Sequence, residues 1–256
     1  MALLHVDFFS NVLGMAANMD VILPEKTKGQ IGMEGNAGGG KYKTLYLLHG
    51  MSDDHTIWQR RTSIERYASE YNLAVVMPTT HLGWYTDMHH GSQYFTFIAR
   101  EVPEVCRWFF KNMSEKREDT FAAGLSMGGY GALKLGLNAP ETFSRVASLS
   151  GGLDVATFCE NPPVEMGDLW VNVFGEKSAV RGSVNDLFAQ AEKLTEKRPA
   201  VYMWCGTEDF LYDQNVRMRD HLEKLGYDLT YEEGPGDHQW KYWDEKIKTV
   251  LEWLPL

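Results

Sequence analysis

The sequence predicts an α/β fold in which a mostly parallel central sheet carries antiparallel strands at its N-terminal side and helices on both faces. Patterns typical of buried strands and amphipathic helices alternate over most of the chain, as they do where helices connect parallel strands. Residues 3–9 and 15–23 instead alternate apolar and polar side chains, which indicates half-exposed antiparallel strands. The length of 256 residues suits one domain that buries most of its apolar surface in a single core.

Composition and charge exclude several classes of protein. The net charge of −10 disfavours a nucleic-acid partner, because the phosphates would be repelled. No apolar run is long enough to cross a bilayer, and residues 1–10 lack the basic and apolar segments of a secretory signal. The three cysteines are scattered and odd in number, so they imply no disulfide framework. These features predict a cytoplasmic protein with no membrane partner.

The individual elements follow from local patterns. A glycine-rich stretch at 29–40 separates the two N-terminal strands from residues 45–48, which are apolar enough for a buried strand. The helix pattern at 94–110 contains Pro103, which would kink or break it. The other strand and helix patterns lie at residues 57–71, 73–77, 120–123, 130–137, 145–150, 200–205, 214–225, 228–232 and 239–253.

Residues 153–198 interrupt this alternation. The segment contains Pro162 and Pro163, a helix-like pattern at 184–194 and no good strand. It is too short for a core of its own. We therefore expect a cap-like insertion over the strand ends of a single domain that spans residues 1–256.

The strongest functional signal is the G-x-S-x-G pattern of residues 124–128, with Ser126 at its centre. It lies between a strand pattern and a helix pattern, which is the context of a nucleophile elbow, where a serine projects its hydroxyl from a strained turn. Gly124 and Gly128 occupy positions at which a Cβ would collide with neighbouring backbone. The pattern predicts that Ser126 attacks an acyl carbon.

A serine hydroxyl is a weak nucleophile and needs a neighbouring base that a carboxylate orients. In folds with this elbow the chain order is serine, acid, histidine. Two histidines follow Ser126. His221 lies inside a helix pattern, where a packed or solvated role is expected. His238 lies in a loop between the last strand and the last helix patterns, so we predict that His238 is the base.

The acid should follow the strand at 200–205, where Glu208 and Asp209 are both candidates. Asp213 lies near a helix start, where the helix dipole favours a carboxylate for structural reasons. Asp237 adjoins His238 in a Gly/Pro-rich segment and is expected to be a turn residue.

An oxyanion hole needs two backbone N–H groups that point at the developing negative charge. One should come from Met127, the residue after the serine, and the other from the loop after strand 45–48. In that loop Met51 is the predicted donor. His49 is expected to brace the loop, because its place in the chain order does not fit a base.

These residues together resemble the esterase D group of α/β-hydrolases, which includes S-formylglutathione hydrolases, tributyrin esterases, feruloyl esterases and mycolyltransferases. The resemblance covers nearly the whole chain and is most specific to the small bacterial tributyrin (acetyl) esterases. It implies the α/β-hydrolase fold, a triad of Ser126, Asp209 and His238, activity on short acyl esters, and no cofactor. The matching motifs are residues 47–51, 83–87, 124–131, 205–212 and 233–238.

Aromatic residues in loops at strand ends can form the walls of an acyl pocket. Trp84, Tyr85 and Trp240 lie in such loops and are predicted to line the substrate pocket. Trp243 lies in a helix pattern, where core packing is the better interpretation.

No metal site is predicted. His89 and His90, with His81 and Asp87 nearby, lack the spacing of known ligand sets, so a surface or pocket-rim loop is expected. Residues 35–41 nearly match a phosphate-binding loop, but they precede a strand and lack the following Ser or Thr, so a flexible turn is the better interpretation.

The sequence thus predicts a serine carboxylesterase that hydrolyses acetyl- or butyryl-type esters through an acyl-enzyme intermediate. The alternatives are an S-formylglutathione thioesterase or a feruloyl-type esterase, and, less directly, an acyltransferase or a non-catalytic binding module on the same fold. The expected partner is a small ester, and the resemblance also allows a homo-oligomer.

Overall fold

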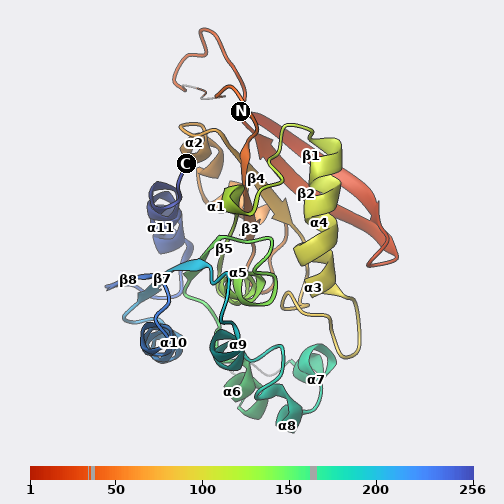
Figure 1. Cartoon of the computed structure of the whole chain (residues 1–256), viewed down its shortest axis with the longest axis vertical. Helices are drawn as coiled ribbons and strands as arrows, with labels where there is room; N and C mark the ends of the chain where they lie inside the picture. Colours follow the sequence, from red (N-terminus) through yellow and green to blue (C-terminus); the bar gives the residue numbers. More distant parts are fainter. Residues whose placement is uncertain (34, 36–37, 162–165) are drawn as a thin grey trace.

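The computed structural model describes residues 1–33, 35, 38–161 and 166–256 (Figure 1). Its centre is a single eight-stranded sheet. The strands are β1 (Ala2–Ser10), β2 (Met15–Leu23), β3 (Lys43–Leu48), β4 (Leu73–Pro78), β5 (Thr120–Leu125), β6 (Arg145–Leu149), β7 (Ala200–Gly206) and β8 (Leu229–Gly234).

The sheet confirms the predicted fold class. The strand order is β1-β2-β4-β3-β5-β6-β7-β8, and the six strands from β3 to β8 are parallel. β1 and β2 form an antiparallel hairpin, and β2 joins the parallel strands by pairing antiparallel with β4. The carboxyl ends of the parallel strands therefore meet at one edge of the sheet, where the loops that carry the predicted site residues also lie.

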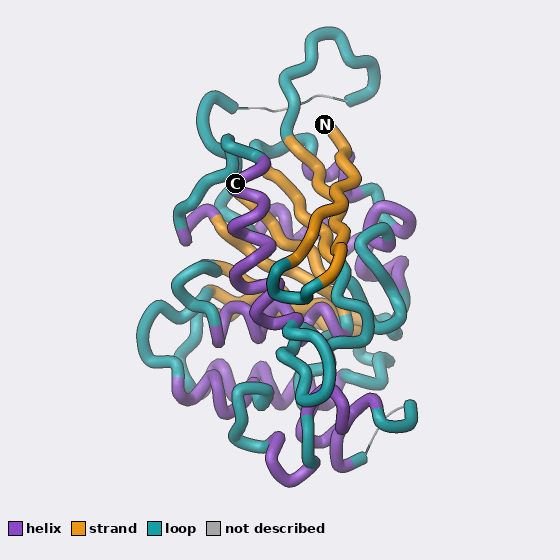
Figure 2. Tube along the Cα trace, turned by 90° about the vertical axis from the view of Figure 1, so that its right-hand side faces the viewer, coloured by secondary structure: helices purple, strands orange, loops and turns teal. Residues whose placement is uncertain are grey.

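Helices cover both faces of this sheet, as Figure 2 shows with the strands in orange and the helices in purple. The helical segments are α1 (Ile57–Arg61), α2 (Ile64–Ala68), α3 (Tyr94–Thr96), the π-helical turn η1 (Phe97–Glu101), α4 (Val102–Phe109), the 3₁₀ turn η2 (Arg117–Asp119), α5 (Met127–Asn138), α6 (Val155–Glu160), α7 (Leu169–Phe174), α8 (Lys177–Val180), α9 (Leu187–Lys193), α10 (Tyr212–Lys224) and α11 (Trp240–Trp253).

Alternation along the strands divides the apolar residues into two cores. On β3, Tyr46 and Leu48 pack into the core beneath α4, α5, α9 and α10. Leu45 and Leu47 point to the opposite face and pack beneath α1, α2 and α11. Because successive strand residues face opposite sides of the sheet, a fully apolar strand such as this one needs helices on both faces.

The single helix predicted at 57–71 is wrong in one respect, since the chain forms two short helices there. Thr62 adopts an extended backbone, and its hydroxyl donates to the carbonyl oxygen of Trp58. The same hydroxyl accepts from the backbone N–H of Ile64 at the start of α2. A threonine side chain that bonds to nearby backbone groups in this way competes with a continuous helix.

Pro103 neither breaks the helix at residues 94–110 nor ends it, and the chain accommodates the proline by a local widening. The proline ring has no N–H to donate to a preceding turn. The turn before it widens into η1, in which the N–H of Val102 reaches back to the carbonyl oxygen of Phe97. The helix therefore continues through a π-helical turn and does not end at the proline.

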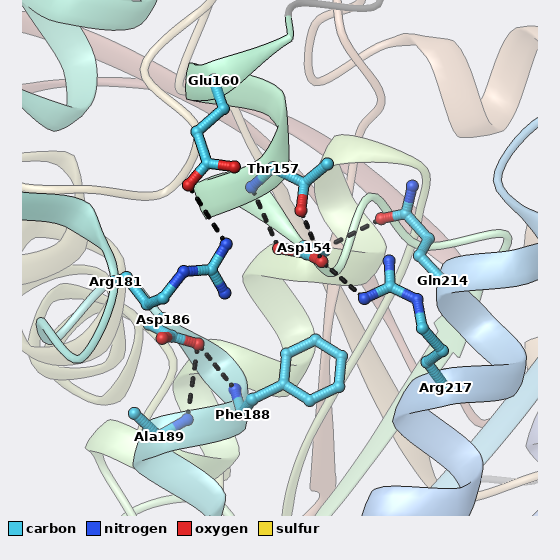
Figure 3. A network of polar contacts seen from close by, with 9 residues as sticks. All are labelled: Asp154, Thr157, Glu160, Arg181, Asp186, Phe188, Ala189, Gln214 and Arg217. Carbon is cyan, nitrogen blue, oxygen red and sulfur yellow. Dashed lines mark hydrogen bonds and ion pairs between the residues drawn. The ribbon is translucent and has the colours of Figure 1, made fainter. Parts of the chain in front are cut away.

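Residues 153–198, which we call the insertion segment, hold four short helices in their described part, and Pro162 and Pro163 lie outside it. Asp154 caps α6 through Thr157 and forms an ion pair with Arg217 of α10 at 2.7 Å (Figure 3). The Asp154 backbone N–H also donates to Gln214 of α10 at 2.9 Å. These contacts fasten the segment to the main body of the chain, so we propose that it is part of one domain. Among the described residues, no helix has both the length and the apolar character needed to cross a membrane.

Candidate active site

Ser126 lies in the sharp turn between β5 and α5, with φ 52° and ψ −117°. Backbone crowding explains the glycines on either side of it. A Cβ on Gly124 would lie 2.4 Å from the carbonyl oxygen of Gly128, and a Cβ on Gly128 would lie 2.4 Å from the carbonyl oxygen of Leu48. Neither backbone atom can move aside as a flexible side chain can, so only glycine fits. The local sequence thus forces the tight turn that exposes the serine hydroxyl.

Strained backbone gathers around this turn. In the described parts of the chain, seven residues other than glycine have φ values in the left-handed region. Such conformations cost free energy and persist where the surrounding structure imposes them, often at functional sites. Six of the seven follow the carboxyl ends of β3, β4, β5 and β6, namely Ser52, His81, Trp84, Tyr85, Ser126 and Ser150.

The structure brings together the predicted nucleophile, base and acid from three loops. His238 Nε2 lies 3.0 Å from Ser126 Oγ, and His238 Nδ1 lies 2.8 Å from Asp209 Oδ2. An ionised carboxylate only accepts hydrogen bonds, so Nδ1 carries the proton and Nε2 is left to accept from the serine hydroxyl. This arrangement can remove the serine proton and hold the resulting imidazolium.

Glu208, the alternative acid, takes a different place. Its carboxylate accepts from the backbone N–H of Gly236 at 2.5 Å, and this bond holds the pKa of Glu208 below its usual value. The Glu208 N–H donates in turn to the Gly236 carbonyl oxygen at 3.0 Å. Asp209 is buried, whereas Glu208 is exposed and clamps the loop that carries His238.

The remaining histidine and the two remaining carboxylates that were considered for the triad take other places. His221 Nε2 lies 3.0 Å from the carbonyl oxygen of Phe188. Asp237 accepts from the side chain of Gln239 at 2.5 Å, as expected for a turn residue. Asp213 lies exposed in the first turn of α10.

Two aromatic rings that the sequence analysis did not assign to the site contact His238. The ring of Phe210 is 67% exposed and lies 4.7 Å from the imidazole centroid. The ring of Trp243 lies 4.8 Å from the imidazole centroid in an edge-on arrangement, and its indole N–H donates to Ser150 Oγ at 3.2 Å. Phe210 follows the acid directly, and this adjacency is the signal that could have identified it. Trp243 belongs to the core as expected, but it also supports the imidazole.

The predicted oxyanion donors, Met127 and Met51, belong to two segments that adjoin Ser126. Met127 is the first residue of α5, where backbone N–H groups have no partner within the helix. Met51 belongs to the His49 loop (residues 49–52), which passes beside the nucleophile. A Cβ on Gly50 would lie 3.8 Å from the Cβ of Ser126. The two segments that carry the predicted donors are therefore both adjacent to Ser126.

His49 holds this loop in place from beneath. Its Nδ1 lies 2.7 Å from the carbonyl oxygen of Gly50, and its Nε2 accepts from the backbone N–H of Thr80 at 3.0 Å. A neutral ring protonated at Nδ1 satisfies both contacts. Burial lowers the pKa of His49 to about 4, which keeps the ring neutral near pH 7.

We expect His49 to make the fold sensitive to acid. Its pKa is about 4 in the folded chain and about 6.5 when unfolded, so the unfolded state alone binds the proton between these values. The free energy of unfolding should therefore fall on the order of 3 kcal/mol as the pH drops from about 6.5 to about 4.

Urea titrations of the wild-type protein and His49→Gln over this pH range measure the effect. The stability advantage of the wild-type protein should shrink towards pH 4, whereas His90→Gln, which removes an exposed histidine, should follow the wild-type curve. Parallel acid limbs for the wild-type protein and His49→Gln would contradict the assignment.

The residues predicted to line the pocket take three different places. Tyr85 is fully buried, and its hydroxyl donates to the carbonyl oxygen of His49 at 2.9 Å, so it supports the His49 loop and forms no pocket wall. Trp84 is 4% exposed and belongs to an aromatic cluster with Tyr130 and residues of the insertion segment. Trp240 is partly buried and packs edge-on against Trp58 and Trp243. The insertion-segment members of the aromatic cluster are Phe158, Trp170 and Phe174.

The histidines considered for a metal site belong to the segment between β4 and α3. The backbone N–H groups of His89 and His90 donate to the carbonyl oxygens of Val173 and Asn172, which attaches this loop to α7. Within the described ranges, no three histidine, cysteine or acidic side chains gather closely enough to hold a metal ion. The glycine-rich stretch includes Asn36 and Ala37, which lie outside the described residues.

Known proteins share this architecture over the full length of the chain. A family model described as "Putative esterase" matches residues 10–254. An acetyl esterase of Caldicellulosiruptor saccharolyticus is 33% identical, over 99% of this chain and 98% of its own length.

Two solved structures from Staphylococcus aureus each match 99% of this chain and 98% of their own. They are the fluorophosphonate-binding serine hydrolase F, at 36% identity and a TM-score of 0.88, and an S-formylglutathione hydrolase, at 35% identity and a TM-score of 0.84. The chain therefore belongs to this esterase family, as a serine ester hydrolase with the α/β-hydrolase fold.

Proposed function

We propose that the protein hydrolyses short-chain acyl esters, of acetyl or butyryl type, with Ser126, His238 and Asp209 as its catalytic triad. The observation that carries the proposal is the continuous hydrogen-bonded chain from Ser126 through His238 to Asp209, with distances of 3.0 and 2.8 Å. Ser126, at one end of these hydrogen bonds, lies in a strained turn beside two candidate N–H donors. A nucleophile, a base, an acid and an oxyanion hole are the groups that acyl transfer needs.

The first half of the reaction acylates the enzyme. His238 Nε2 takes the proton from Ser126 as the serine oxygen attacks the ester carbonyl carbon. The carbonyl oxygen becomes negative and accepts from the N–H groups of Met127 and Met51. The imidazolium then protonates the departing alcohol, and Asp209 stabilises the charged ring while it exists.

The second half returns the enzyme to its starting state. Water gives a proton to His238 Nε2 and attacks the acyl carbon from the side that the alcohol has left. The same N–H groups stabilise the second oxyanion. Its collapse breaks the bond to Ser126 Oγ, which recovers its proton from His238, and the carboxylic acid departs.

Packing beside the nucleophile favours a small acyl group. The Gly152 N–H donates to the Ser126 carbonyl oxygen at 3.1 Å, so this glycine adjoins the elbow. A Cβ on Gly152 would lie 3.1 Å from the rings of both Trp84 and Phe158. The aromatic cluster thus occupies the space on this side, and the acetyl esterase relative supports the same substrate class.

An S-formylglutathione thioesterase is the second candidate, because one structural neighbour with 35% identity carries that name. The same triad can attack a thioester carbonyl, and a formyl group is smaller still than an acetyl group. The two candidate substrates differ in the acyl group, which is formyl or acetyl to butyryl, and in the leaving group, which is a thiol or an alcohol. For either activity we also propose a cytoplasmic location. We further propose that the protein forms a homo-oligomer, which light scattering would detect.

A rate profile over acyl substrates tests the proposal. We expect kcat/KM to be highest for p-nitrophenyl acetate or butyrate and at least about tenfold lower for the octanoate, since a crowded pocket discriminates by one to two kcal/mol or more. Methyl ferulate and S-formylglutathione are measured beside them. A higher kcat/KM for S-formylglutathione than for any oxygen ester would favour the thioesterase, and a maximum at octanoate would contradict the short-chain proposal.

A further inference from the structure

Lys134 is a buried lysine that the proposed mechanism does not use. It lies on α5, eight residues beyond Ser126, and only 1% of its surface is exposed. Burial lowers its pKa to about 7, against an opposing effect of the Asp87 carboxylate. Within the described residues its amino group has hydrogen bonds but no ion-pair partner. Because a buried amino group of this kind costs free energy, its contacts must offset the cost.

Those contacts join three separate parts of the fold. Lys134 Nζ donates to Thr86 Oγ1 and to Asn185 Oδ1, each at 2.7 Å. Thr86 belongs to the loop after β4, and Asn185 belongs to the insertion segment. The rings of Phe95 and Tyr130 each have their centroids 5.4 Å from Nζ. One amino group thus links the helix behind Ser126, the β4 loop and the insertion segment.

The bond to Thr86 determines how its hydroxyl is used. Because the hydroxyl oxygen accepts from Lys134, its own proton is free to donate to another acceptor. It donates to the carbonyl oxygen of Trp84 at 2.8 Å. Trp84 and Tyr85 have φ values of 49° and 48°, so two successive bulky residues are held in the left-handed region. Lys134 and Thr86 therefore stabilise the strained turn through the carbonyl oxygen of Trp84.

This turn supports the nucleophile from two directions. Tyr85 donates to the carbonyl oxygen of His49, in the loop that contains Met51. The Trp84 ring packs against Gly152, whose N–H donates to the carbonyl oxygen of Ser126. A displaced turn would move both the His49 loop and the backbone beside Ser126.

We propose that Lys134 and Thr86 are positioning residues for the ester hydrolysis described above, on which this inference rests. Through Thr86, Lys134 fixes the strained Trp84–Tyr85 turn, and the turn sets the distance between the oxyanion donors and Ser126. Neither side chain touches the substrate. Their removal should lower the rate of the chemical step more than it weakens substrate binding.

Single substitutions at Thr86 give the cleanest test. Thr86→Val removes the hydroxyl at nearly constant shape, and kcat for p-nitrophenyl acetate should fall about tenfold to a hundredfold, because small displacements of catalytic groups have effects of this size. KM should change less than threefold, on the same argument. Thr86→Ser, which keeps the hydroxyl, should restore kcat to within a few-fold of the wild-type value.

A matched control separates positioning from general loss of stability. Thr44 is also buried, and its hydroxyl has no hydrogen-bond partner among the described residues. Thr44→Val should therefore leave kcat unchanged whatever it does to the melting temperature. If Thr86→Val lowers only the melting temperature, with kcat per folded molecule within twofold of wild type, the positioning role is wrong.

Chemical rescue tests Lys134 itself. Lys134 lines a surface pocket of about 440 Å³ together with Asp87, Phe95 and Asn185. In Lys134→Ala this pocket should admit n-propylamine to the vacated position, and a saturating amine concentration should recover most of the lost kcat. The alcohol n-propanol has a similar shape but no amine, and it should recover little.

The outcomes remain distinct from those for the proposed function. If the wild-type protein does not hydrolyse the esters, or if Ser126→Ala retains the full wild-type activity, the proposed function is wrong. An active wild-type protein with wild-type kcat in both Thr86→Val and Lys134→Ala would overturn the positioning role alone. If propylamine and propanol restored kcat equally, the Lys134 side chain would act by filling space and its amino group would have no positioning role.

Discussion

Replacement of Ser126 by alanine should reduce kcat for p-nitrophenyl acetate roughly 10⁵- to 10⁶-fold, the size of effect found when a serine nucleophile is deleted from a triad. In the proposed mechanism the Ser126 hydroxyl oxygen bonds to the acyl carbon, and it is the atom that lies 3.0 Å from His238 Nε2. Residual hydrolysis should come from the N–H groups that stabilise the oxyanion in a direct attack by water. Steady-state kinetics measure kcat and the residual hydrolysis. Pre-steady-state kinetics should show an acyl-enzyme burst in the wild-type protein and none in Ser126→Ala.

Reaction with a fluorophosphonate probe provides the control. The wild-type protein should form a covalent adduct at Ser126, whereas Ser126→Ala should form none. The variant should retain the wild-type melting temperature within a few degrees, because its methyl group fits wherever the serine Cβ fits. An adduct of equal yield on the alanine variant would place the nucleophile at another residue and remove the basis of the proposed mechanism.

The Asp209→Asn variant should lose about 10⁴-fold in kcat. An asparagine side chain can donate its amide N–H to His238 Nδ1, which would favour the tautomer with the proton on Nε2. That tautomer cannot accept the proton of Ser126. The loss should therefore appear in kcat far more than in KM, and it should be equally large for acetate and butyrate esters.

Glu208→Gln is the matched comparison, since the two acidic residues are neighbours. Its amide oxygen can still accept from the Gly236 N–H, so kcat should stay within about tenfold of wild type. If Glu208→Gln instead caused the large loss and Asp209→Asn did not, the acid would be Glu208 and the loop would have to rearrange in solution.

The sequence predicts those parts of the molecule in which a short motif determines the backbone conformation or the chain order determines which loops meet. The strand–serine–helix turn was predictable because Gly124 and Gly128 are dictated by carbonyl oxygens that lie within the same motif or on the adjacent strand. The meeting of the loops that carry Asp209 and His238 followed from chain order, since parallel strands deliver their following loops to one edge of the sheet. The preference for Asp209 over its neighbour Glu208 came from the family resemblance. Neither inference needed the detailed shape of a loop.

The unpredicted parts depend on loop conformation. Tyr85 was expected on a pocket wall, but it follows Trp84 in a turn with two successive positive φ values, and its buried side chain donates to the His49 carbonyl oxygen. No residue pattern signals such a backbone, because both residues are bulky and ordinarily avoid it. Lys134 escaped notice for a related reason. A lysine in a helix pattern is expected in solvent, and only the folded loops reveal that Thr86 and Asn185 contact its amino group.

The clamp between Glu208 and Gly236 has a consequence for how the enzyme is assembled. β7 pairs with β8 as far as Gly206 and Gly234, and the clamp extends that pairing to the loops that carry the acid and the base. Asp209 and His238 therefore belong to one contiguous piece of chain, residues 200–256, whereas Ser126 belongs to the other. Under the proposed mechanism, ester cleavage requires β7 to pair with β6. If the proposed triad acts, turnover reports that pairing, and the reassembly of a chain divided near residue 199 would be measured by recovered esterase activity.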